Sequence, residues 1–318
     1  MSKKSSRNKP ASSQATNKSM NGSSVTTKVA SEPEDHPATI DVQTQSADEA
    51  QTSSPNLVPA ETVLEAHKVR KSYGSVEALH DIDFKLAAGE RVALIGPNGA
   101  GKTTLLQCLS GWLPMDKGEV TICGISLLRE EQKARSSLVM LPDSPSFYQS
   151  LTAWDHMLMI GRFHDLVNVE AASEYLLDSL GLWAVRKNYP STYSRGMKYK
   201  LGLALGLLIN PKVILLDEPT AALDPLSAIV LWEMLDEFEE SSGGAVLLSS
   251  HQVELTTPGI DRFFLMLNGY KIGDDSPKNW IKRYKLPDSA TVANVFTAAI
   301  NDFTRTHPDS IGKDLENR

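Results

Sequence analysis

The distribution of apolar residues divides the chain at about residue 61. Residues 1–60 contain no Phe, Trp or Tyr and few branched aliphatic residues, and they are rich in Ser, Thr, Asn and Gln. A segment of this composition buries too little apolar surface to offset the conformational entropy that is lost on ordering. We therefore expect residues 1–60 to be a disordered, low-complexity tail that precedes a folded domain.

The first part of that domain alternates between apolar and polar positions, at residues 63–69 and again at residues 82–86. Such alternation predicts half-buried strands, here an antiparallel pair. The uninterrupted apolar runs Val92–Ile95 and Val213–Leu216 are typical of strands that are buried on both faces. Further short strands are expected near residues 119–123 and 138–141, and a largely helical stretch from about residue 153 to residue 208.

The C-terminal part carries apolar residues at helical spacing. From Ser289 onward they lie on one face of a predicted amphipathic helix: Val292, Val295, Phe296, Ala299, Ile300 and Phe303. Packing against the main domain is our first interpretation of this face, and a dimer contact or a regulatory role is the second. We expect residues 282–318 to form a helical extension that ends, after about Thr306, in a mobile polar tail.

Composition narrows the class of protein. A membrane-spanning helix needs about 20 consecutive apolar residues, and the most apolar segment, Leu201–Ile209, is closed off by Lys200 and Lys212. The net charge of −7 argues against a dedicated nucleic-acid binder. The two cysteines, Cys108 and Cys123, have no metal-binding spacing, which fits reduced core residues in a cytoplasmic chain.

A glycine-rich loop follows the first apolar run. Residues 96–104 read Gly-Pro-Asn-Gly-Ala-Gly-Lys-Thr-Thr, between a predicted strand and a predicted helix. The glycines let the backbone wrap around a phosphate chain, so that amide groups and the N-terminus of the next helix point at the anion. Lys102 then reaches the outer phosphates, and the Thr103 hydroxyl is placed to hold Mg²⁺. The predicted nucleotide-binding residues of this P-loop are Gly96, Asn98, Gly99, Gly101, Lys102, Thr103 and Thr104.

Two adjacent carboxylates, Asp217 and Glu218, follow the second apolar run. A buried parallel strand delivers both to its carboxyl end, the edge at which open α/β sheets bind ligands. Asp217 would join Thr103 at the magnesium ion, most simply through water. Glu218 would be the general base that orients and deprotonates the attacking water. Two solvated acids at the end of a strand are the alternative, which the upstream P-loop disfavours.

With these two motifs in place, the chain resembles the nucleotide-binding subunits of ABC transporters. Residues 193–198, Tyr-Ser-Arg-Gly-Met-Lys, are similar to the family signature Leu-Ser-Gly-Gly-Gln, and residues 222–225 resemble the D-loop. Residues 248–251 resemble the strand that ends in the switch histidine, His251. Tyr73, which a structural interpretation would place in the core, matches the aromatic residue that stacks on adenine. The resemblance covers about residues 62–276.

Two departures from the family pattern qualify the resemblance. The signature has Tyr193, Arg195 and Met197 at variable positions, as in single-domain subunits that serve export-type permeases, while Ser194 and Gly196 retain the hydroxyl and amide that bind phosphate. Asp143 stands in the Q-loop where the family usually has Gln. Because Asp is shorter, its predicted contact with the metal would need a bridging water.

The resemblance implies an α/β fold of the P-loop NTPase type: a RecA-like core with an antiparallel β subdomain and an inserted α-helical subdomain at about residues 144–205. The nucleotide-binding domain would span residues 61–281. The implied ligands are ATP and Mg²⁺, with Lys102, Glu218 and His251 in catalysis. Two such domains, as a homodimer or heterodimer, would sandwich the nucleotides between the P-loop of one chain and Ser194 and Gly196 of the other.

The resemblance also implies a partner. The chain would energise separate transmembrane permease subunits from the cytoplasmic face of the membrane, docking through residues 147–152, and no nucleic acid is expected. Phe147 and Tyr148 would be anchors in that contact, or alternatively core residues of the helical subdomain. Two other functions stay open: a soluble ABC ATPase that acts outside transport, and a regulatory module that has lost hydrolysis.

Overall fold

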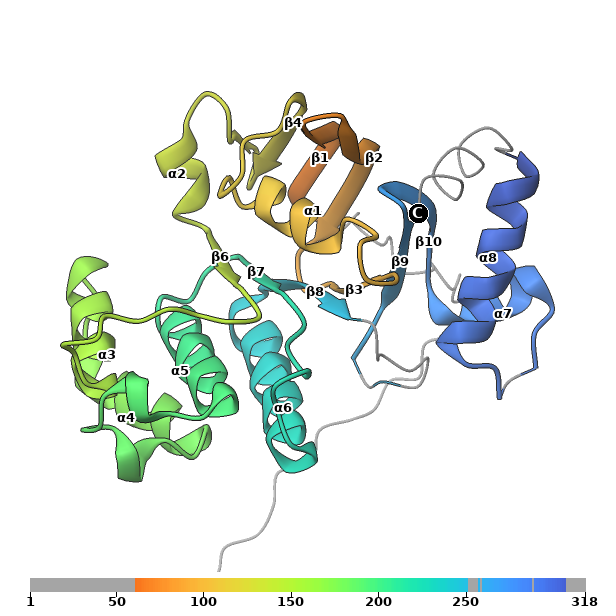
Figure 1. The fold of residues 1–318 in the computed structure, drawn as a ribbon. Helices are drawn as coiled ribbons and strands as arrows, with labels where there is room; N and C mark the ends of the chain where they lie inside the picture. The colour runs from red at the N-terminus through yellow and green to blue at the C-terminus, as the bar shows by residue number, and fades with distance from the viewer. Residues whose placement is uncertain (1–60, 251–256, 258, 288, 307–318) are drawn as a thin grey trace, which may run out of the picture. The chain divides into compact units, whose positions relative to one another are not determined.

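The computed structural model describes residues 61–250, 257, 259–287 and 289–306, all of which belong to the unit Asn56–Arg318 (Figure 1). The predicted N-terminal tail, the predicted C-terminal tail and His251 lie outside the described residues. Two β-sheets and the helices around them form this part of the chain.

The predicted antiparallel pair is confirmed. Strands β1 (Thr62–Tyr73) and β2 (Val76–Ala87) pair antiparallel and are joined by a tight turn at Gly74 and Ser75. Strands β4 (Lys117–Ile122) and β5 (Ile125–Ser126) extend the sheet in the order β2-β1-β4-β5. One face of this sheet is buried, because the apolar residues of the alternating pattern, such as Leu64 and Ile82, point to the same side.

The second sheet has the order β10-β9-β3-β8-β7-β6, and all its neighbouring pairs are parallel except β9 and β10. Its strands are β3 (Arg91–Ile95), β6 (Leu138–Leu141), β7 (Val213–Leu216), β8 (Ala245–Ser250), β9 (Arg262–Leu267) and β10 (Tyr270–Asp275). Successive residues of β3 enter two different cores: Val92 and Leu94 face the antiparallel sheet, whereas Ala93 and Ile95 face the helical side. Burial on both faces explains the uninterrupted apolar runs.

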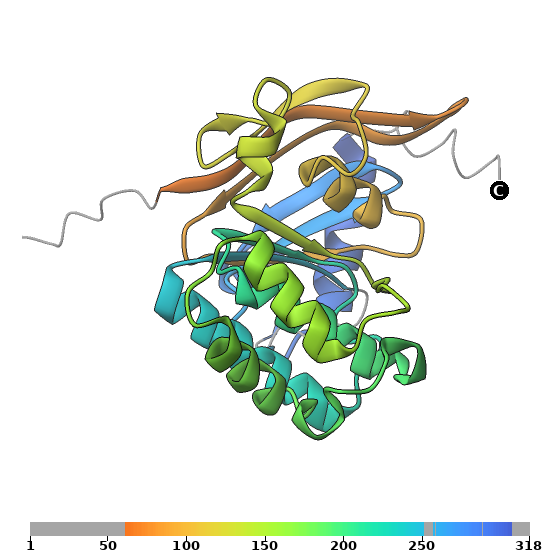
Figure 2. The ribbon, with the colours of Figure 1, turned by 90° about the vertical axis from the view of Figure 1, so that its left-hand side faces the viewer.

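Helices fill the two layers beside the parallel sheet (Figure 2). Helix α1 (Lys102–Leu109) packs in the layer between the sheets, where Leu105 and Leu106 are fully buried. On the other side, α3 (Ala153–Phe163), α4 (Val169–Ser179) and α5 (Arg195–Leu208) contact one another and form the helical subdomain. Helix α6 (Pro225–Ser242) covers the same side of the sheet, and the short helix α2 (Glu131–Arg135) precedes β6.

The C-terminal helices α7 (Pro277–Tyr284) and α8 (Val292–Thr306) pack against the main domain. Val295 and Ala299 of α8 are fully buried, and α8 contacts both β10 and α7. The apolar face that the sequence predicts therefore faces this chain's own core. Among the described residues no helix has the length and apolarity needed to cross a membrane.

Candidate active site

The P-loop lies at the carboxyl end of β3 and opens α1, as the sequence predicts. Its backbone has no room for side chains at two positions: a Cβ on Gly96 would lie 2.5 Å from the Met266 carbonyl oxygen, and one on Gly101 would lie 2.7 Å from that of Ala78. Gly101 also has a φ of 98°, which favours glycine. Asn98 and Gly99 are exposed at the tip of the loop, and Thr104 is half-buried on α1.

The Lys102 side chain is hydrogen-bonded to the backbone of the P-loop. Its ammonium group donates a hydrogen bond to the Gly96 carbonyl oxygen at 2.8 Å and another to that of Pro97 at 3.3 Å. The same nitrogen lies 3.5 Å from the Glu218 carboxylate. The P-loop carbonyls thereby position a single positive charge between the loop and the end of β7, where a phosphate chain needs it.

The carboxyl ends of three neighbouring strands converge on Asp217. The Thr103 hydroxyl at the start of α1 donates to the Asp217 carboxylate, at 2.9 Å to Oδ2 and 3.1 Å to Oδ1. Ser249, at the end of β8, donates its hydroxyl to Asp217 Oδ1 at 2.6 Å. Because β3, β8 and β7 are adjacent and parallel, their carboxyl ends meet at one edge of the sheet. The cluster of Lys102, Thr103, Asp217 and Glu218 follows from this topology.

Ser249 is a site residue that the motif analysis missed. Its hydroxyl also accepts the backbone N–H of Glu218 at 2.9 Å, so one side chain orients both acidic residues. The signal in the sequence is its position at the carboxyl end of a buried strand. Glu218 itself has a φ of 47°, in the left-handed region that non-glycine residues rarely adopt.

The oxygen atoms of Thr103 and Asp217 are suitable ligands for Mg²⁺. A magnesium ion at a nucleotide site typically takes one or two protein carboxylates, phosphate oxygens and water rather than a cage of acidic residues. In the described part of the chain there is no group of three or more His, Cys, Asp or Glu residues that would hold a metal ion alone. The hydroxyl and carboxylate pair fits an ion that arrives with a phosphate ligand.

Asp143 forms an ion pair with a signature residue, Arg195. Its carboxylate accepts a hydrogen bond from the guanidinium group of Arg195 at 2.9 Å. Two of the residues at which the chain departs from the family pattern, one in the signature and one in the Q-loop, therefore pair with each other. The metal-binding role of Asp143 stays a prediction.

The signature residues begin helix α5. Ser194 is the N-cap, and its hydroxyl accepts the backbone N–H of Met197 at 3.2 Å. A Cβ on Gly196 would lie 2.7 Å from the Ala222 carbonyl oxygen, so the signature packs tightly on the D-loop. The Tyr193 hydroxyl donates to the Val185 carbonyl oxygen at 2.9 Å, which accounts for an aromatic residue at this position. Among the described residues, the Ser194 hydroxyl bonds within α5 and the near neighbours of a Cβ on Gly196 belong to the D-loop.

Two tyrosines lie in opposite environments, one exposed and one buried. Tyr73 ends β1 with half of its surface exposed and the Lys71 ammonium group 5.9 Å from its ring centre, so it is not a core residue. Tyr199, on α5, is fully buried, and burial raises the pKa of its phenol well above the usual value, with Asp217, Asp143 and Glu218 adding to the effect. Its hydroxyl has no hydrogen-bond partner in the described part of the chain.

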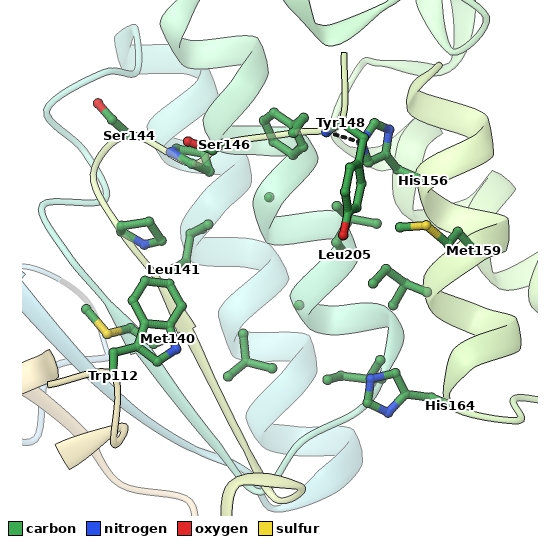
Figure 3. A pocket seen from close by; sticks show the side chains of 18 residues that line it. Trp112, Met140, Leu141, Ser144, Ser146, Tyr148, His156, Met159, His164 and Leu205 are labelled. Atoms are coloured by element: carbon green, nitrogen blue, oxygen red, sulfur yellow. Dashed lines mark hydrogen bonds between the residues drawn. The ribbon is translucent and has the colours of Figure 1, made fainter. Parts of the chain in front are cut away.

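A second candidate surface follows Asp143 along the chain. A pocket of about 750 Å³ is lined by β6, the segment that follows it, α3 and α5, with Trp112 contributing from the loop after α1. Figure 3 shows the Tyr148 ring beside His156, with Trp112 and Met140 on the opposite side. Phe147 is half-buried and packs on the core, whereas Tyr148 is 64% exposed. We call this hollow the docking pocket, and residues 144–152 the docking segment.

Fold and site define a P-loop ATPase with an antiparallel β subdomain and an inserted helical subdomain. Residues 79–221 match the family described as "ABC transporter", and residues 186–257 match one described as "AAA domain, putative AbiEii toxin, Type IV TA system". The chain belongs to the ABC transporter ATP-binding proteins, and it is an ATP-binding and ATP-hydrolysing subunit of that family.

Named relatives agree with this assignment. The linearmycin resistance ATP-binding protein LnrL of Bacillus subtilis is 32% identical over 213 residues, which are 66% of this chain and 68% of LnrL. The uncharacterized ABC transporter ATP-binding protein YdbJ of the same organism is 33% identical over 210 residues, 66% of this chain and 68% of YdbJ. A solved ATP-binding subunit of an ABC transporter superimposes with a TM-score of 0.69 at 28% identity, over 75% of this chain and all of that one.

Proposed function

We propose that this chain binds ATP with Mg²⁺ and uses its hydrolysis to drive a transmembrane permease that is a separate chain. The observation that carries the ATPase part is the convergence of Lys102, Thr103, Asp217 and Glu218 at one edge of the parallel sheet. Lys102 would hold the outer phosphates, and Thr103 and Asp217 would hold the metal. Bound Mg²⁺ would supply neutralisation of the charge that develops on the phosphates.

Glu218 is the general base in this proposal. Its backbone N–H is fixed by Ser249 and its carboxylate lies at the mouth of the P-loop beside Lys102. A carboxylate in this place can accept a proton from water that attacks the terminal phosphate. Tyr73, exposed at the end of β1, would stack on the base, and His251 would contact the γ-phosphate.

The active form would be a dimer of nucleotide-binding domains. Ser194 and Gly196 present a helix N-terminus, which is an anion-binding feature, and in this chain Ser194 bonds within α5 while Gly196 packs on the D-loop. A second domain, identical or different, would bring its signature to the nucleotide of the first. Each nucleotide would then be held from both sides, which stabilises the departing phosphoryl group.

The docking pocket supports the transport part of the proposal. It is an apolar hollow at the junction of the parallel sheet and the helical subdomain, and the exposed Tyr148 ring lies at its side. An exposed aromatic residue beside such a hollow suits an anchor for a helix of a permease. Docking there would hold the chain at the cytoplasmic face of the membrane. An ABC ATPase that acts outside transport is the alternative.

Substitution of Glu218 by Gln tests the ATPase mechanism. Glu218→Gln should retain ATP binding and accumulate as a nucleotide-bound dimer on size-exclusion chromatography, while turnover falls by about 10²-fold or more because the base is lost. Lys102→Ala is the matched contrast, since it should weaken nucleotide binding itself. Hydrolysis by Glu218→Gln at the parental rate would show that the base is another residue.

A further inference from the structure

His156 is a buried histidine in the docking pocket. It lies in the second turn of α3 and is 2% exposed. The Phe147 ring meets the imidazole edge-on with ring centres 5.5 Å apart, and the Tyr148 ring stacks beside it at 6.0 Å. Both aromatic residues of the docking segment therefore rest on this one side chain, as Figure 3 shows for Tyr148.

Two hydrogen bonds fix the protonation state that this arrangement requires. The backbone N–H of Tyr148 donates to His156 Nε2 at 3.0 Å, and His156 Nδ1 lies 2.7 Å from the Thr152 carbonyl oxygen. An amide N–H only donates and a carbonyl oxygen only accepts. Nε2 must therefore be unprotonated and Nδ1 must carry the proton. The imidazole is neutral and ties the two ends of the sequence from Tyr148 to Thr152 together.

We propose that neutral His156 positions the docking segment for its membrane partner, and that protonation of the imidazole releases the segment, so that coupling to the permease is lost in acid. The proposal rests on the permease docking that we propose above. A proton on Nε2 would face the Tyr148 N–H donor to donor, so that this amide would lose its acceptor. The Thr152 carbonyl oxygen also accepts the backbone N–H of His156 at 3.0 Å, so it keeps its donors when the ring is protonated. The hydrogen bond that is lost is the one from the Tyr148 N–H.

The surrounding charges do not oppose this release. The titratable side chains that line the pocket among the described residues are Tyr148, His156 and His164. Asp155 precedes His156 in α3, but its carboxylate accepts the N–H of Thr152 at 3.0 Å and the hydroxyl of Thr152 at 2.6 Å. These bonds hold the pKa of Asp155 below its usual value. In the part of the chain described here, no carboxylate forms an ion pair with His156.

Two substitutions separate the hydrogen bond from the charge. His156→Gln keeps an acceptor, Oε1, within reach of the Tyr148 N–H and does not titrate, whereas His156→Leu removes the acceptor. His164→Gln is the matched control, because His164 lines the same pocket but its ring packs against its own neighbour, Phe163. The full-length chain is used throughout, with ATP hydrolysis as a check on folding.

Three readouts test the proposal. Nitrogen NMR of the His156 ring should show the Nδ1–H tautomer at pH 8, and hydrogen exchange of the Tyr148 amide should be about tenfold faster in His156→Leu than in the parent. Binding to inside-out membrane vesicles from source cells that lack this chain should fall about tenfold for the parent between pH 8 and pH 5.5. His156→Gln should bind alike at both values, and His164→Gln should behave as the parent.

An Nε2–H tautomer, or an unchanged Tyr148 exchange rate in His156→Leu, would overturn the positioning role of His156. Equal loss of binding in acid by the parent and by His156→Gln would overturn the proton-release step. His156→Leu could free the Tyr148 amide and still bind vesicles as the parent does. In that case the permease docking proposed for this pocket is wrong, and so is the proposed release of the permease in acid. Protein-free liposomes of the same lipids separate binding to lipid from binding to a membrane protein.

Discussion

Asp217 keeps a nearly buried carboxylate at the active site because its neighbours replace the water that burial removes. Its side chain accepts hydrogen bonds from the hydroxyls of Thr103 and Ser249. A buried carboxylate without such donors would be costly, since its charge is poorly solvated. The left-handed backbone of Glu218 costs of the order of 1–3 kcal/mol, and the bond to Ser249 helps to hold it. Strain at this residue is compatible with a role in chemistry.

Arg195 and Asp143 give a prediction at the same scale. Their side chains are 53% and 46% exposed, so the ion pair should contribute no more than about 1 kcal/mol to the free energy of unfolding. We expect Asp143→Asn and Arg195→Gln each to lower the free energy of unfolding by less than about 1 kcal/mol. The double variant should be at least as stable as the less stable of the two single variants. Urea unfolding at low and high salt measures the coupling, which should vanish at 1 M salt.

The predicted metal role of Asp143 has a separate readout. If its carboxylate reaches Mg²⁺ through water, Asp143→Asn should raise the magnesium concentration that gives half-maximal hydrolysis, and Arg195→Gln should not. In the urea experiment described above, a coupling between Arg195 and Asp143 that persists at about 1 M salt would show that the two side chains form a structural ion pair shielded from solvent.

Among the elements, those with a local pattern were predictable. The alternation at residues 63–69 and 82–86 gives β1 and β2, the run at residues 213–216 matches β7 residue for residue, and the predicted strand at 138–141 is β6. The pairing of Arg195 with Asp143 was not predictable, because their sequence separation of 52 residues is bridged only by the folded chain. The same holds for Ser249, which reaches Asp217 only because β8 lies beside β7. Local pattern fixes an element, whereas a contact between elements depends on topology.

The docking segment yields a prediction at the scale of elements. Tyr148→Ala removes an exposed ring that covers one side of the docking pocket, so the free energy of unfolding should change by less than about 0.5 kcal/mol. Hydrolysis by the isolated subunit should persist, and binding to inside-out membrane vesicles should fall tenfold or more, as expected for an aromatic anchor. Phe163→Ala is the control, since Phe163 is 81% exposed on α3 and is not a lining residue of the pocket.

Unfolding of Tyr148→Ala would place the ring in the core of the helical subdomain after all. Unchanged vesicle binding, with the ATPase intact, would count against the docking pocket as the permease contact and in favour of an ABC ATPase that acts outside transport.

Across the described domain, one short stretch of chain connects the active site at Asp217 with the docking segment. Strand β6 ends beside β7, whose last residue precedes Asp217, and the chain then runs through Asp143 into the docking segment. The Asp217 N–H donates to the Leu141 carbonyl oxygen at 2.9 Å, and this hydrogen bond joins the start of that stretch to the active site. A shift of the Q-loop when nucleotide binds would therefore move the docking segment directly.

The boundary of the folded domain gives the last prediction. The Glu61 carbonyl oxygen accepts the Ala88 N–H at 2.8 Å, and β1 begins at the next residue, so the first described residue is already part of the folded domain. Residues 1–60 contain six basic and six acidic side chains, so their removal also leaves the net charge at −7. Deleting them should leave the thermal unfolding midpoint within about 2 °C and ATP affinity unchanged.

A deeper deletion, of residues 1–66, is the matched control. It also removes Leu64, which is fully buried and pairs with both Leu86 of β2 and Ile122 of β4 in the centre of the antiparallel sheet. Loss of a buried leucine alone costs about 2–5 kcal/mol, so this variant should unfold at a much lower temperature or not fold. Calorimetry and titration with a fluorescent ATP analogue give both quantities. If removal of residues 1–60 alone lowers the unfolding midpoint by more than about 5 °C, the tail stabilises the domain, and the prediction that it is disordered is wrong.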